Sequence, residues 1–167
     1  ELLRILEHLP FGAAALIQKP VGADLAAAQR LRAICRERRL CVAVNFQLRF
    51  SPNVLALQDL LQRGTLGAII DVDVRVVTEH PWHLWSFLRG APRLEVLYHS
   101  INYLDAIRAL LGEPEGVYCR AVGRADMSDF SDTRSSIILD YGDHLRCSLA
   151  MNHTYRGGAT GRVSELK

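Results

Sequence analysis

Two short stretches of this sequence carry residue types that could exchange protons with a small molecule. In the first, an apolar run over residues 13–17 leads through Gln18 into Lys19 and Pro20. A short apolar run that ends at a proline and precedes a helical pattern is typical of a buried parallel strand. Open α/β sheets bind their ligands at the carboxyl ends of the strands. The Lys19 ammonium is therefore placed to hold a substrate hydroxyl or to take part in its proton transfer.

The second stretch begins a helix that is predicted to run from Tyr98 to the Leu-Leu-Gly sequence at residues 110–112. His99, Asn102 and Asp105 are three residues apart and share one helix face. An imidazole has an unperturbed pKa near neutrality and can act as a base, whereas an amide can only orient a substrate by hydrogen bonds. The spacing therefore predicts a polar cluster at the start of this helix, with an ordinary polar surface as the alternative.

The first third of the chain predicts a parallel α/β arrangement. A helical pattern over residues 2–9, the apolar run at 13–17, a helix over 24–39 capped by Asp24 and an apolar run at 41–46 follow one another. Helix and strand alternating in this way is the pattern of βαβ units.

The pattern changes after Ser51-Pro52, which is a strong helix start. Residues 70–77 alternate between apolar and polar side chains, which indicates a sheet with one dry face. Strands are also predicted at 116–122, 134–141 and 144–151, with a hairpin turn at 141–144. The predicted fold class is α/β plus α+β, with domains at 1–48 and 49–167 and a mostly antiparallel open sheet in the second.

Composition excludes several classes of protein. The 167 residues are 49% apolar and carry a net charge of +2, which suits a globular protein and is too little charge for nucleic acid binding. No apolar stretch approaches the roughly 20 residues that span a bilayer, and no signal peptide is visible. The four cysteines lack metal-ligand spacing and lie among apolar residues, so they are predicted to be reduced core residues of a cytoplasmic protein.

An aromatic, histidine-rich loop lies between the predicted strands. His80 and His83 are three residues apart but lack carboxylate partners, and His144 and His153 are distant in sequence, so no metal site is predicted. Trp82 could stack on a sugar ring, or it could cap the core.

Together these stretches resemble the Gfo/Idh/MocA family of NAD(P)-dependent sugar and polyol oxidoreductases. The matching segments are Gln18-Lys19-Pro20, the run from Val44 to Pro52, and His99 to Asp105 followed by Leu110-Leu111-Gly112-Glu113-Pro114. The resemblance covers about residues 10–155. It implies the end of a Rossmann domain followed by an α/β domain whose open sheet commonly makes oligomer contacts, so the sequence is expected to be a fragment.

The resemblance also implies where the site lies. Lys19 matches the lysine near the nicotinamide and the substrate hydroxyl, and Pro20 matches the proline that shapes the turn. Asn45 and Arg49 match the segment that lines the substrate pocket.

The family's Asp-x-x-x-His pattern falls on Tyr98 and Asn102, and both residues depart from it. We therefore expect His99, one turn away, to form a two-member proton relay with Lys19. Tyr98 is retained as a substrate contact, as is Trp82.

The predicted function is hydride transfer between NAD or NADP and a sugar, an inositol or a related polyol, by a homo-oligomer. The glycine-rich G-x-G-x-x-G loop and the acidic residue that follows it are absent from the sequence. The fragment alone is therefore expected to bind dinucleotide poorly and to be inactive. The alternative is a non-catalytic nucleotide- or sugar-binding regulatory protein on the same scaffold, which the departures at Tyr98 and Asn102 favour.

Overall fold

The computed structural model describes residues 2–155 together with the backbone of residues 162–166. The chain divides into two compact units, Glu1–Gln47 and Leu48–Lys167. None of the helices in this described part is long and apolar enough to cross a membrane. The assignment of the two units to a dinucleotide-binding and a substrate-binding domain remains a prediction.

The first unit is a helix–strand–helix–strand arrangement of α1 (Leu2–His8), β1 (Ala14–Ile17), α2 (Leu25–Glu37) and β2 (Cys41–Val44). The strands β1 and β2 pair in parallel, with Ile17 opposite Val44. Helix α2 begins where expected, because the Asp24 carboxylate accepts the backbone N–H of Ala27 at 2.7 Å.

The prediction that the 13–17 strand is buried is wrong for one of its faces. Ile17 is 5% exposed and packs with Leu6 of α1 and Leu31 of α2. Leu16 points to the opposite face and is 68% exposed. Among the described residues the two helices cover a single face of this sheet, so an apolar run alone overstates the burial.

The second unit is built on a five-stranded sheet in the order β4-β5-β6-β3-β7. A 3₁₀ turn (Gln47–Phe50) leads into α3 (Pro52–Gln62), which Pro52 opens at its first position. The remaining elements are β3 (Asp71–Thr78), 3₁₀ turns at Trp82–Leu84, Ser86–Leu88 and Ala125–Met127, a π-helical turn (Val96–Ser100), α4 (Ile101–Leu111), β4 (Gly116–Val122), β5 (Arg134–Asp140), β6 (Arg146–Asn152) and β7 (Arg162–Leu166).

The sheet is mostly antiparallel, as the sequence predicts, with one parallel pair. β5 pairs antiparallel with β4 and β6, and β7 pairs antiparallel with β3. β3 and β6 instead run parallel, with Val77 opposite Asn152. The chain therefore leaves β3 and β6 at the same end of the sheet.

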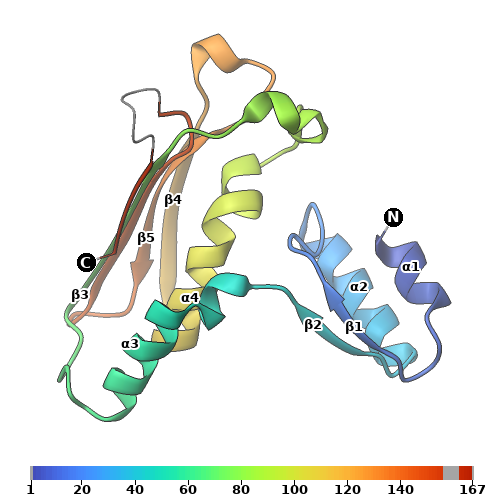
Figure 1. Ribbon diagram of the computed structural model, residues 1–167, viewed down its shortest axis with the longest axis horizontal. Coiled ribbons are helices and arrows are strands. Elements are labelled where there is room, and N and C mark those ends of the chain that lie inside the picture. The colour runs from blue at the N-terminus through green and yellow to red at the C-terminus, as the bar shows by residue number, and fades with distance from the viewer. Residues whose placement is uncertain (1, 156–161, 167) are drawn as a thin grey trace. The chain divides into compact units, whose positions relative to one another are not determined.

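Helix α4 covers one face of this sheet, as Figure 1 shows. Val74, Val76, Ile137 and Leu149 are each at most 4% exposed and pack with Ile107 of the helix. The polar residues that alternate with the valines of β3 point to the opposite face. The predicted period of two is confirmed here.

The helix that carries His99 starts earlier than predicted. It begins at Leu94 rather than Tyr98, and its residues Val96–Ser100 form a π turn before α4 proper. A π turn adds one residue to a helical turn and is frequent at functional sites. His99 therefore lies in a segment where the three-residue spacing of an ordinary helix does not fix side-chain direction.

The cysteines are less uniformly buried than predicted. Cys147 is fully buried, and burial raises the pKa of its thiol to about 11. Cys41 and Cys119 are exposed, which corrects their assignment to the core. Each of these two side chains occupies an exposed position of its strand, Cys41 in β2 and Cys119 in β4.

Two adjacent isoleucines of β5 test the packing of the sheet. Ile137 is 2% exposed and Ile138 is 51% exposed. Ile137→Ala should lower the free energy of unfolding by about 2 to 5 kcal/mol, because it leaves a cavity in the core. Ile138→Ala, the matched control, should cost about 1 kcal/mol or less. Urea denaturation at several protein concentrations measures both, and equal losses would contradict the assigned faces.

Candidate functional site

In the first unit, the segments after β1 and β2 meet as predicted. The Asn45 backbone N–H donates to the Ile17 carbonyl at 2.8 Å, and the Asn45 side-chain amide donates to Gln18 Oε1 at 3.4 Å. Lys19 follows directly, joined to Pro20 by a cis peptide bond. Three of the predicted site residues, Lys19, Pro20 and Asn45, therefore share the carboxyl end of this sheet.

The Lys19 amine is suited to proton transfer. It is half-buried, and desolvation lowers its pKa below the ordinary lysine value, because burial disfavours the charged form. Lys19 and Lys167 are also the two lysines among the 20 basic residues of the chain. Since arginine stays charged and lysine can titrate, the choice of lysine at position 19 is a chemical signal that the sequence analysis did not use.

Arg49 is engaged by the protein itself. Its Nε and Nη2 donate to the two carboxylate oxygens of Asp105 at 2.9 and 2.7 Å, which joins the 3₁₀ turn at Gln47–Phe50 to α4. The hydrogen bonds to Asp105 raise the pKa of the guanidinium. The structure therefore assigns Arg49 to a bidentate clamp, and the predicted substrate contact stays a prediction.

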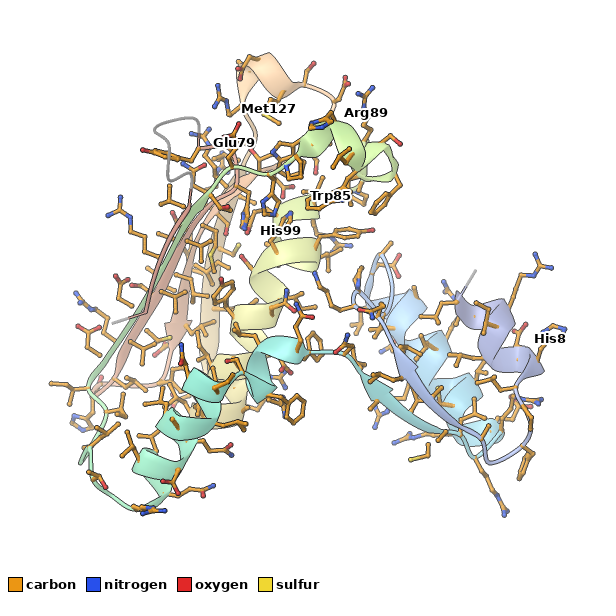
Figure 2. All side chains as sticks on the ribbon, in the orientation of Figure 1. His8, Glu79, Trp85, Arg89, His99 and Met127 are labelled. Atoms are coloured by element: carbon orange, nitrogen blue, oxygen red, sulfur yellow. The ribbon has the colours of Figure 1, made fainter. Side chains whose placement is uncertain are left out.

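In the second unit, a cavity of about 370 Å³ contains the predicted pair His99 and Asn102. Figure 2 labels His99 on the helix, near Trp85 of the loop that follows β3. The Asn102 side-chain amide donates to the His99 carbonyl at 3.3 Å. The cavity is also lined by His80, Trp85, Tyr103 and His153.

Three histidines gather at this cavity. His80 Nε2 lies 3.2 Å from His99 Nδ1, and the His80 ring centroid is 4.5 Å from that of His99 and 4.7 Å from that of His153. The His99 and His153 rings stack with centroids 4.1 Å apart. One ring nitrogen from each lies within 4.8 Å of the others. This cluster, His80, His99 and His153, is called the histidine triad below.

A buried carboxylate lies behind the triad. Glu95 is 0% exposed and accepts hydrogen bonds from Ser100 Oγ at 2.8 and 2.9 Å. Its Oε1 is 3.5 Å from His153 Nδ1. Burial raises the pKa of Glu95, and the hydrogen bonds from Ser135 and Ser100 oppose that shift.

Tyr98 and Trp82, the two predicted aromatic substrate contacts, pack into the protein. Both lie against the apolar cluster of Leu88, Leu94 and Phe130. Trp82 Nε1 also donates to the His153 carbonyl at 3.0 Å. Trp82 therefore caps a core, the second of its two predicted roles, although its edge lines a smaller cavity of about 250 Å³ beside His80 and His153.

The sequence analysis paired His80 with His83 and so missed the triad. His83 is exposed, whereas His80 follows β3 and His153 follows β6, two strands that run parallel and end together. An isolated β-bridge between Glu79 and Thr154 holds the segments that follow β3 and β6 side by side. The prediction of a mostly antiparallel sheet did not specify that β3 and β6 pair in parallel, so it did not bring these positions together.

A larger cavity of about 460 Å³ lies among α3, β3 and α4, and its lining is mostly apolar. Asp71 lines it, and that carboxylate accepts from Arg146 Nε at 3.1 Å. The lining of this cavity includes no histidine, whereas the cavity around His99 is lined by three.

Comparison with known proteins agrees with the fold. The bovine trans-1,2-dihydrobenzene-1,2-diol dehydrogenase is 29% identical over 177 aligned positions, which cover 97% of this chain and 50% of that enzyme. An oxidoreductase from Agrobacterium radiobacter, solved with NAD+, L-tartaric acid and magnesium, superposes with a TM-score of 0.79 at 17% identity over 98% of this chain and 49% of that one. The WlbA dehydrogenase from Bordetella pertussis, solved with NADH and UDP-GlcNAcA, superposes with a TM-score of 0.71 at 17% identity. The superposition covers 92% of this chain and 47% of that one.

No protein-family model matches the chain. The chain spans 37% to 50% of the length of the curated relatives it matches, all of which are named dehydrogenases. It therefore has the fold of the Gfo/Idh/MocA oxidoreductases, and its homologues are dehydrogenases, which confirms the predicted resemblance.

The Arg49–Asp105 clamp generates a stability prediction. Arg49→Gln should lower the free energy of unfolding by about 1 to 2 kcal/mol, because the Asp105 side chain is 9% exposed and loses both of its charged donors. That figure allows for screening at Arg49, whose side chain is 41% exposed.

The exposed Arg63–Asp59 pair supplies the control. Its Nε–Oδ1 distance is also 2.9 Å, yet the two side chains are 70% and 53% exposed, so Arg63→Gln should cost about 0.5 kcal/mol or less. Urea denaturation measures both variants, and a double-mutant cycle with Asp105→Asn isolates the coupling. Additive losses at Arg49 and Asp105 would contradict the clamp.

Proposed function

We propose that this chain is part of an NAD(P)-dependent dehydrogenase that oxidises a secondary alcohol of a sugar, an inositol or a related polyol. The observation that carries the proposal is the half-buried Lys19, whose amine has a lowered pKa at the carboxyl end of β1. The relatives named as dehydrogenases and the two solved neighbours that hold NAD+ or NADH support it. A diol is the substrate class in the name of the bovine relative.

The residues present suit a nicotinamide cofactor. Its ring accepts the hydride when bound, and the protein must then supply position and a proton acceptor. In this proposal Lys19 and Pro20 form the edge of the sheet at which the ring is held, and Asn45 lies beside them. A lysine with a lowered pKa is more readily neutral, and a neutral amine does not repel the positively charged nicotinamide ring as a protonated amine would.

The substrate contacts proposed for the second unit lie at its histidine cavity. His99 and Asn102 face the histidine cavity, where the imidazole can accept a hydroxyl proton and the amide can orient a neighbouring hydroxyl. Trp85, which lines the same cavity, offers an aromatic edge to the apolar face of a sugar ring. Lys19 in the first unit and His99 in the second are each proposed as a residue that exchanges a proton, and Arg49 and Tyr98 are proposed to act by shaping the second unit rather than through the reacting atoms.

A non-catalytic binding protein is the second candidate. The family's Asp-x-x-x-His positions are Tyr98 and Asn102 here, so the carboxylate and the imidazole of that pattern are both missing from those positions. Such a protein would keep the cavity and the cofactor site while lacking turnover.

We also propose that the open face of the second unit's sheet mediates self-association. This face exposes Tyr118 at 62% and Ile138 at 51%, and the β3 end of it carries Asp71 and Arg75. A mixed apolar and charged face of this kind suits a polar-rimmed interface between copies.

The first test separates the dehydrogenase from the binding protein. Full-length protein is incubated with NAD+ or NADP+ and a panel of polyols, inositols and diols, and nicotinamide reduction is followed by absorbance. The proposal predicts reduction with at least one member of the panel. Cofactor binding by calorimetry without reduction of the nicotinamide by any member would establish the alternative.

The second test addresses the two proposed proton-exchanging residues, Lys19 and His99, in the full-length protein. Lys19→Arg keeps a positive charge but removes the titratable amine, and it should lower kcat by about 10²- to 10⁴-fold. His99→Gln should lower kcat and flatten the acidic limb of the pH–rate profile, because the proton acceptor is gone. Unchanged turnover and pH profile in either variant would exclude that residue from proton exchange, and calorimetric cofactor affinity controls for misfolding.

A further inference from the structure

The histidine triad has the composition of a metal site, and it is the one such group of metal-ligating side chains among the described residues. We propose that His80, His99 and His153 bind a divalent transition metal ion of the Zn2+ class. The inference stands apart from the proposed function, because it rests on the arrangement of three imidazoles and is tested by metal binding.

The spacing of the ring nitrogens suits one ion. Two nitrogens that each bind zinc at 2.0–2.1 Å in tetrahedral geometry lie about 3.3 Å from one another. His80 Nε2 and His99 Nδ1 are 3.2 Å apart, and one ring nitrogen from each of the three histidines lies within 4.8 Å of the others. The His99 and His153 rings are stacked with centroids 4.1 Å apart, so binding of one ion by all three side chains requires His153 to turn out of this stack. In the absence of metal the same 3.2 Å contact is a hydrogen bond between the two rings.

The donor set selects the class of ion. Three imidazoles suit Zn2+, Cu2+, Ni2+ or Co2+, whereas Mg2+ and Ca2+ prefer oxygen ligands. Three histidines with an open fourth position are the ligand pattern of catalytic rather than structural zinc. Here the fourth position faces the cavity of about 370 Å³ that Asn102 and Trp85 also line.

Glu95 supplies the outer support that histidine metal sites commonly have. Its Oε1 is 3.5 Å from His153 Nδ1, so a proton held at Nδ1 leaves Nε2 as the metal-binding nitrogen. Ser100 holds the Glu95 carboxylate through both oxygens. The fully buried carboxylate also offsets the charge of a bound cation.

The site is built on fixed elements and is reachable. His99 lies in the π turn, His153 directly follows β6, and His80 follows β3, whose parallel pairing with β6 sets the two positions side by side. Two cavities, of about 370 and 250 Å³, both have His80 and His153 in their linings. An ion can therefore reach the triad without opening the core.

Metal binding has a consequence for the proposed role of His99. A ring nitrogen bound to a metal cannot accept a proton at the same time, so a metal-loaded triad and a proton-accepting His99 are mutually exclusive states of one side chain. An ion at the triad would instead offer its fourth position to a hydroxyl or carboxylate oxygen of the molecule in the cavity.

The test uses full-length protein stripped with a chelator and then titrated with Co2+, whose visible bands report its coordination, and with Zn2+ by calorimetry. One ion per chain is expected, with Co2+ bands of a four- or five-coordinate nitrogen site and a higher Tm in excess Zn2+. His80→Gln, in the loop after β3, should weaken Zn2+ binding by at least about 100-fold. Glu95→Gln should weaken it by about 10- to 100-fold.

His83→Gln is the matched control, since His83 is an exposed histidine of the same loop and lies outside the triad. Its Zn2+ affinity should equal that of the unaltered protein. Absence of Co2+ bands and of a Tm shift would overturn the metal site and leave a hydrogen-bonded histidine cluster. Equal Zn2+ affinity in His80→Gln and His83→Gln would overturn it as well, and either result leaves the dehydrogenase proposal standing.

Discussion

The parallel pairing of β3 with β6 is the constraint on which the second unit depends. Because Val77 lies opposite Asn152, the chain leaves both strands at one end of the sheet. His80 and His153 are 73 residues apart in the sequence, yet this register makes them neighbours. The π turn then brings His99 against them from the helix that covers the sheet. A polar site thus forms where three separate elements end.

Polar groups in this region are held by charge-assisted contacts rather than left to solvent. Glu95 is completely buried, and its carboxylate accepts a hydrogen bond from the Ser100 hydroxyl, which lies within 2.9 Å of both oxygens. Asp132 accepts the Glu95 backbone N–H at 2.6 Å, which ties the helix start to the loop before β5. Asp105, further along the helix, is held by Arg49. The helical segment is therefore held at two points, at Glu95 by Asp132 and at Asp105 by Arg49, so the cavity that it lines is pre-organised.

The sequence predicted most of the elements because their signals are local. Asp24 caps α2, Pro52 opens α3, and the valines of β3 alternate as they should. It also brought Lys19 and Asn45 to one edge, since parallel strands joined by a helix must end together.

What the sequence could not supply depends on contacts between distant segments. The order of strands in the second sheet determines which histidines meet, and no local pattern encodes that order. The π turn moved His99 off the simple three-residue spacing. Arg49 looked like a free pocket residue because its partner, Asp105, lies 56 positions away. Leu16 is exposed because the helices pack on the other face of its sheet. An apolar run in the sequence does not show which face the helices cover.

Nuclear Overhauser effects between assigned histidine ring protons test the central arrangement most directly. The ring centroids of His80, His99 and His153 are 4.1 to 4.7 Å apart, so mutual cross-peaks are expected among all three rings. The ring of His144, which lies before β6 at the opposite end of that strand from His153, should show none to them. Cross-peaks from His80 to His83 in place of His153 would show that β3 and β6 do not end together, and the histidine cavity would not exist.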